Sequence, residues 1–235
     1  MDKIDEIICK NEYLNSYNGK ESTEWSNFWY DQANTESEHR ILLIGDSVSR
    51  QIRGTMARKL NCPVDLFATS AALRDIMFWE QFKCFFKNGL YHYDAVFIWI
   101  GNHSRRKEDG TDFFTQYDYQ RFHNDFSKLV DICRASFPKV IILSTLHMFI
   151  PRKANRYIEY IREILNIKPK EKFDDAENAV VEAKNKIIEQ VANEYNLTFY
   201  DIDDIMLKSK YWHKDNIHYI RKSDSFVTSK LISLL

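Results

Sequence analysis

The stretch Ile41-Leu42-Leu43-Ile44-Gly45-Asp46-Ser47 places four consecutive apolar residues directly before a glycine turn and a serine. A short apolar run that ends at a glycine predicts a strand buried on both faces. The residues that follow, 49–60, have the apolar spacing of an amphipathic helix. A buried strand that leads into a helix predicts the start of an α/β domain.

Strands and helices continue to alternate after residue 60. The pattern predicts strands at 64–68, 95–100, 140–144 and 198–201, and helices at 73–87, 119–137, 174–195 and 223–235. This alternation predicts a three-layer α/β/α sandwich with a mostly parallel central sheet covered by helices on both faces. Ligands bind beyond the carboxyl ends of the strands in such sheets. Ser47 and the segment Gly101-Asn102-His103 each follow a strand, so both are expected at this edge.

The composition limits the classes of function. The chain of 235 residues is most simply one domain, and its 44% apolar residues allow a large core. The 33 basic and 34 acidic residues nearly cancel, which argues against nucleic-acid binding as a main role. No apolar run approaches the roughly 18 residues of a membrane-spanning helix. The N-terminus lacks the pattern of a secretory signal, so we expect a cytoplasmic protein.

No metal or organic cofactor is expected. The four cysteines are scattered without Cys-x-x-Cys spacing and are predicted to be reduced, mostly buried thiols. The isolated histidines show no convincing metal-ligand spacing. They are His39, His92, His123, His147 and His213.

Two segments lie outside the regular alternation. Residues 1–39 are predicted to be a helical extension packed on the main domain, residues 40–235, because Ser22-Thr23-Glu24 is a possible helix cap. Trp25, Phe28 and Trp29 then have the i, i+3, i+4 spacing of one helix face. The basic, partly amphipathic residues 151–173 are predicted to form either a lid facing the substrate or a solvated surface helix.

The chemistry is concentrated in Gly45-Asp46-Ser47 and Asp215-Asn216-Ile217-His218. A serine at the exit of a strand is well placed for nucleophilic attack if a histidine takes its proton. That histidine needs a carboxylate on its other ring nitrogen to fix its tautomer and orientation. An Asp-x-x-His turn supplies both groups from one loop. We therefore predict Ser47, His218 and Asp215 as a catalytic triad.

The order and position of these two motifs resemble the SGNH (GDSL-type) hydrolase superfamily, which contains esterases, lipases, carbohydrate deacetylases and a few acyltransferases. The block Gly45-Asp46-Ser47-Val48-Ser49-Arg50 also resembles the Gly-Asp-Ser-x-x-Arg block of plant cell-wall polysaccharide O-acetyltransferases, a related branch. The resemblance implies a flavodoxin-like sandwich, an acyl-enzyme on Ser47 and no cofactor.

The resemblance also implies three donors to the oxyanion. The first is the backbone N–H of Ser47. The second block, where the family often has Gly-x-Ser-Gly, is Ala68-Thr69-Ser70-Ala71 here, and Ala71 N–H is the predicted donor. In the third block the family has asparagine two residues after a glycine. His103 holds that position in strict register, whereas Asn102 serves if the loop shifts by one, and both remain candidates.

Three further residues are weaker candidates for contact with the substrate. Asp46 is expected to stabilise the turn as an Asx-type acceptor. Arg50, one turn into the helix, either holds an acidic substrate group or forms a surface salt bridge. Ser70 belongs to the altered second block.

These features predict a serine esterase acting on an O-acylated, most simply O-acetylated, carbohydrate or its precursor. The expected partner is thus a small acylated substrate. One alternative is a carbohydrate O-acyltransferase with the same triad, in which a sugar hydroxyl replaces water. The other is a glycan-binding protein that keeps the fold without catalysis, which the altered second and third blocks motivate.

Overall fold

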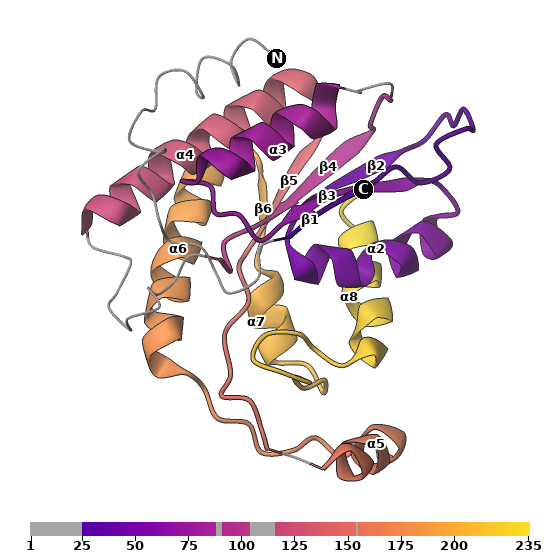
Figure 1. Cartoon of the computed structure of the whole chain (residues 1–235), viewed down its shortest axis with the longest axis vertical. Coiled ribbons are helices and arrows are strands. Elements are labelled where there is room, and N and C mark those ends of the chain that lie inside the picture. Colours follow the sequence, from indigo (N-terminus) through magenta and orange to yellow (C-terminus); the bar gives the residue numbers. More distant parts are fainter. Residues whose placement is uncertain (1–24, 88–90, 104–115, 154) are drawn as a thin grey trace.

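The protein is built around one six-stranded sheet with the strand order β1–β3–β2–β4–β5–β6 (Figure 1). The computed structural model describes residues 25–87, 91–103, 116–153 and 155–235. All neighbouring strands are parallel except β1, which pairs with β3 in the antiparallel sense. The strands are β1 Ser26–Trp29, β2 Ile41–Gly45, β3 Val64–Thr69, β4 Ala95–Trp99, β5 Val140–Leu143 and β6 Thr198–Tyr200.

Helices cover both faces of this sheet, which confirms the predicted three-layer α/β/α sandwich. One face carries α3, α4 and most of the apolar side of α6, and the other carries α2, α7 and α8. The helices are α2 Ser47–Leu60, α3 Ile76–Lys87, α4 Gln116–Ser136, α5 Arg156–Leu165, α6 Asp175–Glu194, α7 Ile202–Leu207 and α8 Asp224–Ile232, with a short 3₁₀ helix η2 at Arg221–Ser223.

The apolar run in β2 divides its side chains between the two layers of the core. Leu42 and Ile44 pack with the aromatic residues of α3 and α4. Ile41 and Leu43 pack against α2 and α8 on the opposite face. Successive side chains of a strand point to opposite faces, so every residue of this central strand must be apolar. Burial on both faces therefore explains why the apolar residues of β2 are continuous and do not alternate with polar ones.

The N-terminal aromatic segment is a strand, and the predicted helix is wrong there. Ser26–Trp29 forms β1 and pairs with Leu66–Thr69 of β3. Phe28 packs against Phe67 and Phe85, with ring centroids 5.7 Å apart in both contacts. The described part of the predicted extension is thus the edge of the main sheet, not a separate layer. The predicted cap at 22–24 lies outside the described residues.

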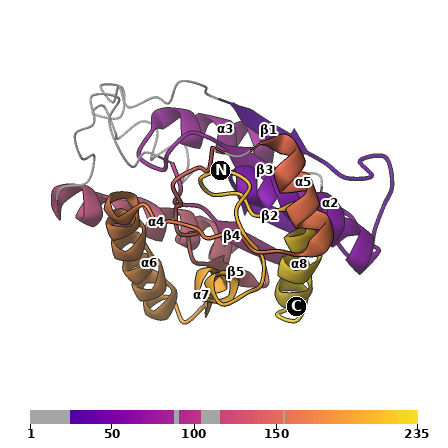
Figure 2. The ribbon, with the colours of Figure 1, turned by 90° about the horizontal axis from the view of Figure 1, so that it is seen from below.

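The connection after β5 contains a largely exposed amphipathic helix, α5. Figures 1 and 2 place it beyond the carboxyl ends of the strands, on the side of α2 and α8. The Lys222 ammonium donates to the carbonyl of Glu163, and Lys168 Nζ donates to Ser209 O at 3.1 Å. The helix therefore stands beside residues 209–222 as a surface element. Its exposed apolar side chains are Tyr157, Ile158, Tyr160, Ile161, Ile164 and Leu165.

The prediction of mostly buried thiols is met only in part. Of the described cysteines, Cys133 is buried, Cys62 is half-buried and Cys84 is exposed, and all three are free thiols. Within the described ranges, no helix combines the length and the apolar character that crossing a bilayer requires.

The short helix α7, which the sequence pattern did not predict, anchors the β5–α5 connection. Asp203 Oδ1 accepts the backbone N–H of His147 at 2.7 Å, and its other oxygen pairs with His147 Nδ1. Glu182 Oε1 lies 3.5 Å from His147 Nε2. The hydrogen bond with Asp203 raises the pKa of His147 above its usual value, although burial opposes this.

We expect His147→Gln to cost more stability in acid than in base. A raised pKa in the folded state means that folding favours the protonated imidazole. That contribution is complete below the unfolded value of about 6.5 and is lost as the pH rises through the folded value. Urea unfolding of both proteins at about pH 5.5 and about pH 9 measures the difference, with the exposed His92→Gln as the control. An equal loss at both pH values contradicts the assignment.

Candidate active site

The β2–α2 turn presents Ser47 at the start of a helix. A Cβ at Gly45 would lie 2.0 Å from Ser49 Oγ and 2.7 Å from Trp99 O, so only glycine fits where β2 ends. Asp46 caps α2, with Oδ1 accepting the Val48 N–H at 2.9 Å. This is the predicted Asx-type role. Because Ser47 is the first residue of α2, its own N–H has no acceptor within the helix.

A tight loop near the C-terminus carries His218 and Asp215. Its two sides are joined by the bridge between His213 and Tyr219 and by the hydrogen bond from Lys214 N–H to His218 O, at 2.8 Å. Within the loop, Asp215 Oδ1 accepts the backbone N–H groups of Ile217 at 3.0 Å and His218 at 2.7 Å. The aspartate thus shapes the turn that holds the histidine.

Ser47, His218 and Asp215 form a continuous hydrogen-bonded chain. His218 Nε2 lies 2.7 Å from Ser47 Oγ, across 171 residues of sequence. His218 Nδ1 lies 3.0 Å and 3.1 Å from the two Asp215 oxygens. Partial burial opposes ionisation of Asp215, but the hydrogen bonds from His218 and from the two backbone N–H groups outweigh it and lower its pKa to about 2. The carboxylate is therefore ionised at neutral pH and fixes the Nδ1–H tautomer of His218.

Packing behind the loop fixes its position. The buried His213 ring lies between Phe149 and Tyr219, with centroids 3.8 Å from each. Its Nδ1 lies 3.0 Å from Glu171 Oε1, which also accepts the His213 N–H at 2.7 Å. Burial lowers the pKa of His213 below its usual value, and the Glu171 carboxylate opposes this shift. His213 is thus a packing residue behind the triad loop.

Gln51 holds α2 and the histidine loop in register, a role that the sequence analysis missed. Its Nε2 donates to Tyr219 O at 3.0 Å and to Asp224 Oδ1 at 2.6 Å. Gln51 follows Ser47 by four residues and lies on the same face of α2. That spacing is the sequence signal by which it is recognisable.

The third block brings Asn102 to the nucleophile turn. Asn102 is buried, and its Nδ2 donates to Asp46 Oδ2 at 2.8 Å. An amide NH₂ has two N–H donors, so a second one remains beside the Asp46–Ser47 turn. Lys184 Nζ donates to the carbonyls of Gly101 at 2.9 Å and His103 at 3.3 Å, on both sides of Asn102. Lys184 is therefore a positioning residue for this loop.

The predicted second donor is directed elsewhere. Ala71 N–H donates to Thr69 Oγ1 at 3.0 Å, and Thr69 Oγ1 donates to Gln81 Oε1 at 2.6 Å. This is a hydroxyl turn, in which a threonine side chain captures the N–H two residues later. Ser70 Oγ accepts the Trp25 N–H at 2.8 Å and so ties β1 to β3. The prediction for Ala71 is wrong in this conformation, and Ser70 has a structural bond.

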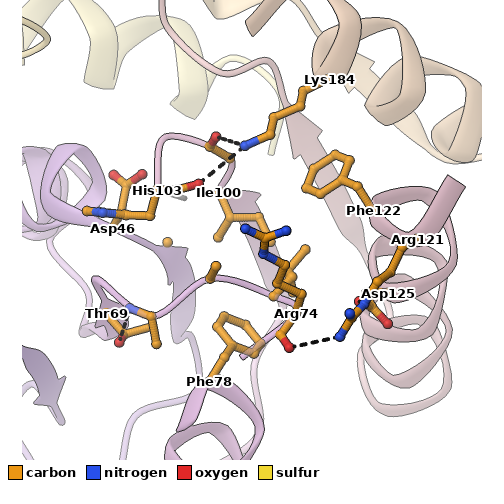
Figure 3. Close-up of a pocket in the computed structure, with 15 residues that line it drawn as sticks. Asp46, Thr69, Arg74, Phe78, Ile100, His103, Arg121, Phe122, Asp125 and Lys184 are labelled. Carbon is orange, nitrogen blue, oxygen red and sulfur yellow. Dashed lines mark hydrogen bonds and ion pairs between the residues drawn. The ribbon is translucent and has the colours of Figure 1, made fainter. Parts of the chain in front are cut away.

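His103 lines a separate cavity, to which Asp46 also contributes (Figure 3). The cavity lies between the carboxyl ends of the strands and the α3 and α4 helices. Arg121 donates to Arg74 O at 3.1 Å across its floor and pairs with Asp125 at 3.5 Å. The His103 ring meets the edge of Trp25, with centroids 6.4 Å apart. His103 thus faces this cavity and Trp25, whereas Asn102 contacts the nucleophile turn directly.

A second hollow, open to solvent, contains the triad itself. This groove, of about 820 Å³, is lined by Ser47, His218 and Asp215 together with Gln51, Arg50, Lys214 and Arg221. The guanidinium of Arg50 lies over the Trp25 ring, 4.7 Å from its centroid. Among the described residues, no group of three His, Cys, Asp or Glu side chains is arranged to hold a metal ion.

Comparisons with known proteins agree with the fold. No family model matches the sequence, and no curated protein matches it. An α/β-hydrolase enzyme from the metagenome of Lake Arreo is similar in structure, with a TM-score of 0.57, 14% identity, and coverage of 85% of this chain and 95% of that one.

Two esterase structures are similar to the same extent. An acetyl xylan esterase has a TM-score of 0.53 and 14% identity over 83% of this chain and 99% of its own. An acetylxylan esterase from Geobacillus stearothermophilus has a TM-score of 0.54 and 12% identity over 84% of this chain and 94% of its own. The chain therefore has the fold of these esterases, in agreement with the resemblance found in the sequence.

Proposed function

We propose that this protein is a serine esterase of the SGNH type. The observation that carries the proposal is the 2.7 Å contact between His218 Nε2 and Ser47 Oγ, with the Asp215 carboxylate on the other ring nitrogen. A serine hydroxyl is a weak nucleophile until an oriented base accepts its proton. The similarity of fold to acetylxylan esterases supports the same class of reaction.

In the proposed reaction, Ser47 Oγ attacks the ester carbonyl while His218 Nε2 takes its proton. The C–O bond to the alcohol then breaks as His218 returns that proton to the leaving oxygen. Water then attacks the acyl carbonyl while His218 takes its proton, and His218 gives that proton to Ser47 Oγ as the acyl C–O bond breaks, which releases the acid and restores Ser47. Asp215 stays ionised throughout and stabilises the imidazolium that forms twice.

The negative oxygen of the tetrahedral intermediate is proposed to bind at the start of α2. Ser47 N–H is a free first-turn donor there, and the positive end of the helix dipole favours an anion. The second N–H of Asn102 Nδ2 is the proposed side-chain donor, because Asp46 holds this amide against the turn. Ala71 N–H is not used, because Thr69 Oγ1 accepts it.

The proposed substrate is an O-acetylated carbohydrate. The groove around the triad is open and lined by polar side chains, which suits hydroxylated sugars better than long acyl chains. The names of the two acetylxylan esterases point in the same direction. Transfer of the acetyl group to a sugar hydroxyl would use the same acyl-enzyme, and product analysis distinguishes it from hydrolysis.

The decisive experiment combines labelling with product analysis. A fluorophosphonate is expected to add once, on Ser47, and acetate is expected to appear from acetylated sugars. If the acetyl group is instead transferred to an added acceptor sugar and little acetate is released, the protein is an acyltransferase rather than an esterase. Folded protein that neither labels nor turns over an activated ester, yet binds glycans, overturns both in favour of a binding protein.

We expect Asn102→Ala to lower kcat by a factor of about 10²–10³, the usual loss for one oxyanion donor. His103→Ala, one residue away and facing Trp25, is expected to change kcat less than tenfold by the same reasoning. Steady-state kinetics on p-nitrophenyl acetate measures both. Thermal melting of Asn102→Ala checks that the protein still folds without the tether to Asp46. A larger loss of kcat in His103→Ala than in Asn102→Ala identifies His103 as the oxyanion donor.

A further inference from the structure

The groove around Ser47 has a local excess of positive charge. Its lining contains the cations Arg50, Lys214 and Arg221 but a single carboxylate, Asp215. That carboxylate is already bonded to His218. The whole chain has a formal net charge of −1, so this concentration of cations at the reacting serine departs from the average surface.

None of these cations forms an ion pair within the part of the chain that the structure describes. Arg50, Lys214 and Arg221 are exposed, and no described carboxylate lies within ion-pair distance of them. Asp224 interacts electrostatically with Arg221 and Lys214, but burial raises its pKa and its Oδ1 already accepts a hydrogen bond from Gln51 at 2.6 Å. The charges are therefore available to a ligand in the groove.

Arg50 is the best prepared of the three to bind an anion. It lies on α2 one turn after Ser47, and its guanidinium is held over the Trp25 ring at 4.7 Å. Stacking restricts the side chain before binding but leaves its edge N–H groups free for a planar, two-point contact with an oxyanion. Lys214 lies in the loop that carries His218, and Arg221 begins η2 directly after it, so the cations reach the groove from two regions far apart in sequence.

We propose that the substrate is an anionic carbohydrate, that is, a sugar that carries a carboxylate or phosphate close to the ester. This inference rests on the proposed esterase function and specifies its substrate class. A neutral acetylated sugar gains only ordinary hydrogen bonds from the three cations beside Ser47. An anionic one gains attraction on approach and direct contacts once bound.

The expected preference is moderate, because exposed pairs in water are individually weak. Each is worth a factor of about two, so three together give a preference of about tenfold for the anion. The preference is expected to shrink in high salt, because salt screens exposed charges over about 10 Å at 0.1 M.

The test compares substrates that differ only in charge. An O-acetylated uronic acid glycoside is paired with its uncharged uronamide, and an O-acetylated sugar phosphate with the parent sugar. The ratio of kcat/KM within each pair is measured for the wild type and for Arg50→Gln, Lys214→Gln and Arg221→Gln. Arg58→Gln is the matched control, because Arg58 is on the same helix but contacts Thr55 Oγ1 outside the groove.

A ratio of about ten in the wild type, lowered about twofold by each groove variant and unchanged by Arg58→Gln, supports the proposal. Preference in one pair alone identifies the anion as carboxylate or phosphate. Equal rates within both pairs overturn it while leaving the esterase function intact. If no ester is turned over, calorimetry of the same compounds with Ser47→Ala decides: tighter binding of the anions upholds the cationic site without the esterase, and equal or absent binding overturns it.

Discussion

Replacing Ser47 by alanine is expected to lower kcat by a factor of about 10⁴–10⁶ and to abolish labelling by a fluorophosphonate. The substitution removes the atom that attacks the carbonyl and leaves His218 without a proton donor at 2.7 Å. His218→Ala is expected to lower kcat as much, because an unactivated serine is nearly inert. The double variant should lose no more than either single one, since the two residues act as a unit.

Ser49→Ala provides the matched control for this experiment. Ser49 lies on the same helix two residues later, is fully buried, and its Oγ has no hydrogen-bond partner among the described residues. The variant makes the same chemical change next to the site, and it is expected to retain labelling and turnover. Intact mass and the labelled peptide identify the adduct. An adduct that persists in Ser47→Ala removes Ser47 from the proposed mechanism.

The sequence predicted the central fold because its signals there are local. Each buried parallel strand is a short apolar run next to a helix with 3.6-residue spacing, and burial on both faces leaves no alternative to apolar side chains. The approach of Ser47 to His218 was predictable for a similar reason. Ser47 was predicted at the end of a strand, and parallel sheets collect such turns at one edge. The Asp-x-x-His turn was assigned to the same site because a serine nucleophile needs both a base and a carboxylate that orients it.

The strand β1 shows what local signals miss. Trp25, Phe28 and Trp29 have helical spacing, but pairing with β3 across about forty residues decides the conformation. The spacing of the aromatic residues contains no information about the strand that pairs with them, so pairing overrides the helical conformation that the spacing predicts. The α7 helix was missed for the opposite reason. Its cap, Asp201, accepts the Asp204 N–H at 3.1 Å. An aspartate is a recognisable helix cap in a sequence, but Asp201 was assigned to the end of the predicted strand 198–201.

The details of the candidate site depended on hydrogen bonds that the sequence does not specify. The Thr69 hydroxyl competes for the Ala71 N–H, and the Asp46 carboxylate draws in Asn102. Lys184, more than eighty residues further along the chain, supports the loop that carries Asn102. The motifs therefore predicted which elements meet, whereas the assignment of donors required their geometry.

Replacing Asp215 by asparagine is expected to lower kcat by a factor of about 10³–10⁴ with little change in the fold. The reason lies in how the side chain is held. Its Oδ1 accepts the N–H groups of Ile217 and His218, so the asparagine oxygen must keep that place. The asparagine NH₂ then occupies the Oδ2 position, 3.0 Å from His218 Nδ1.

An NH₂ at that position reverses the tautomer of His218. Nδ1 becomes the acceptor and Nε2 carries the proton, so Nε2 cannot take the proton of Ser47. Nitrogen-15 shifts of the His218 ring report this exchange directly, alongside kinetics on p-nitrophenyl acetate. Asp204→Asn, on the exposed pair with Lys208, is the control for the charge change. Activity within tenfold of the wild type, with the tautomer reversed, would mean that His218 is not the base.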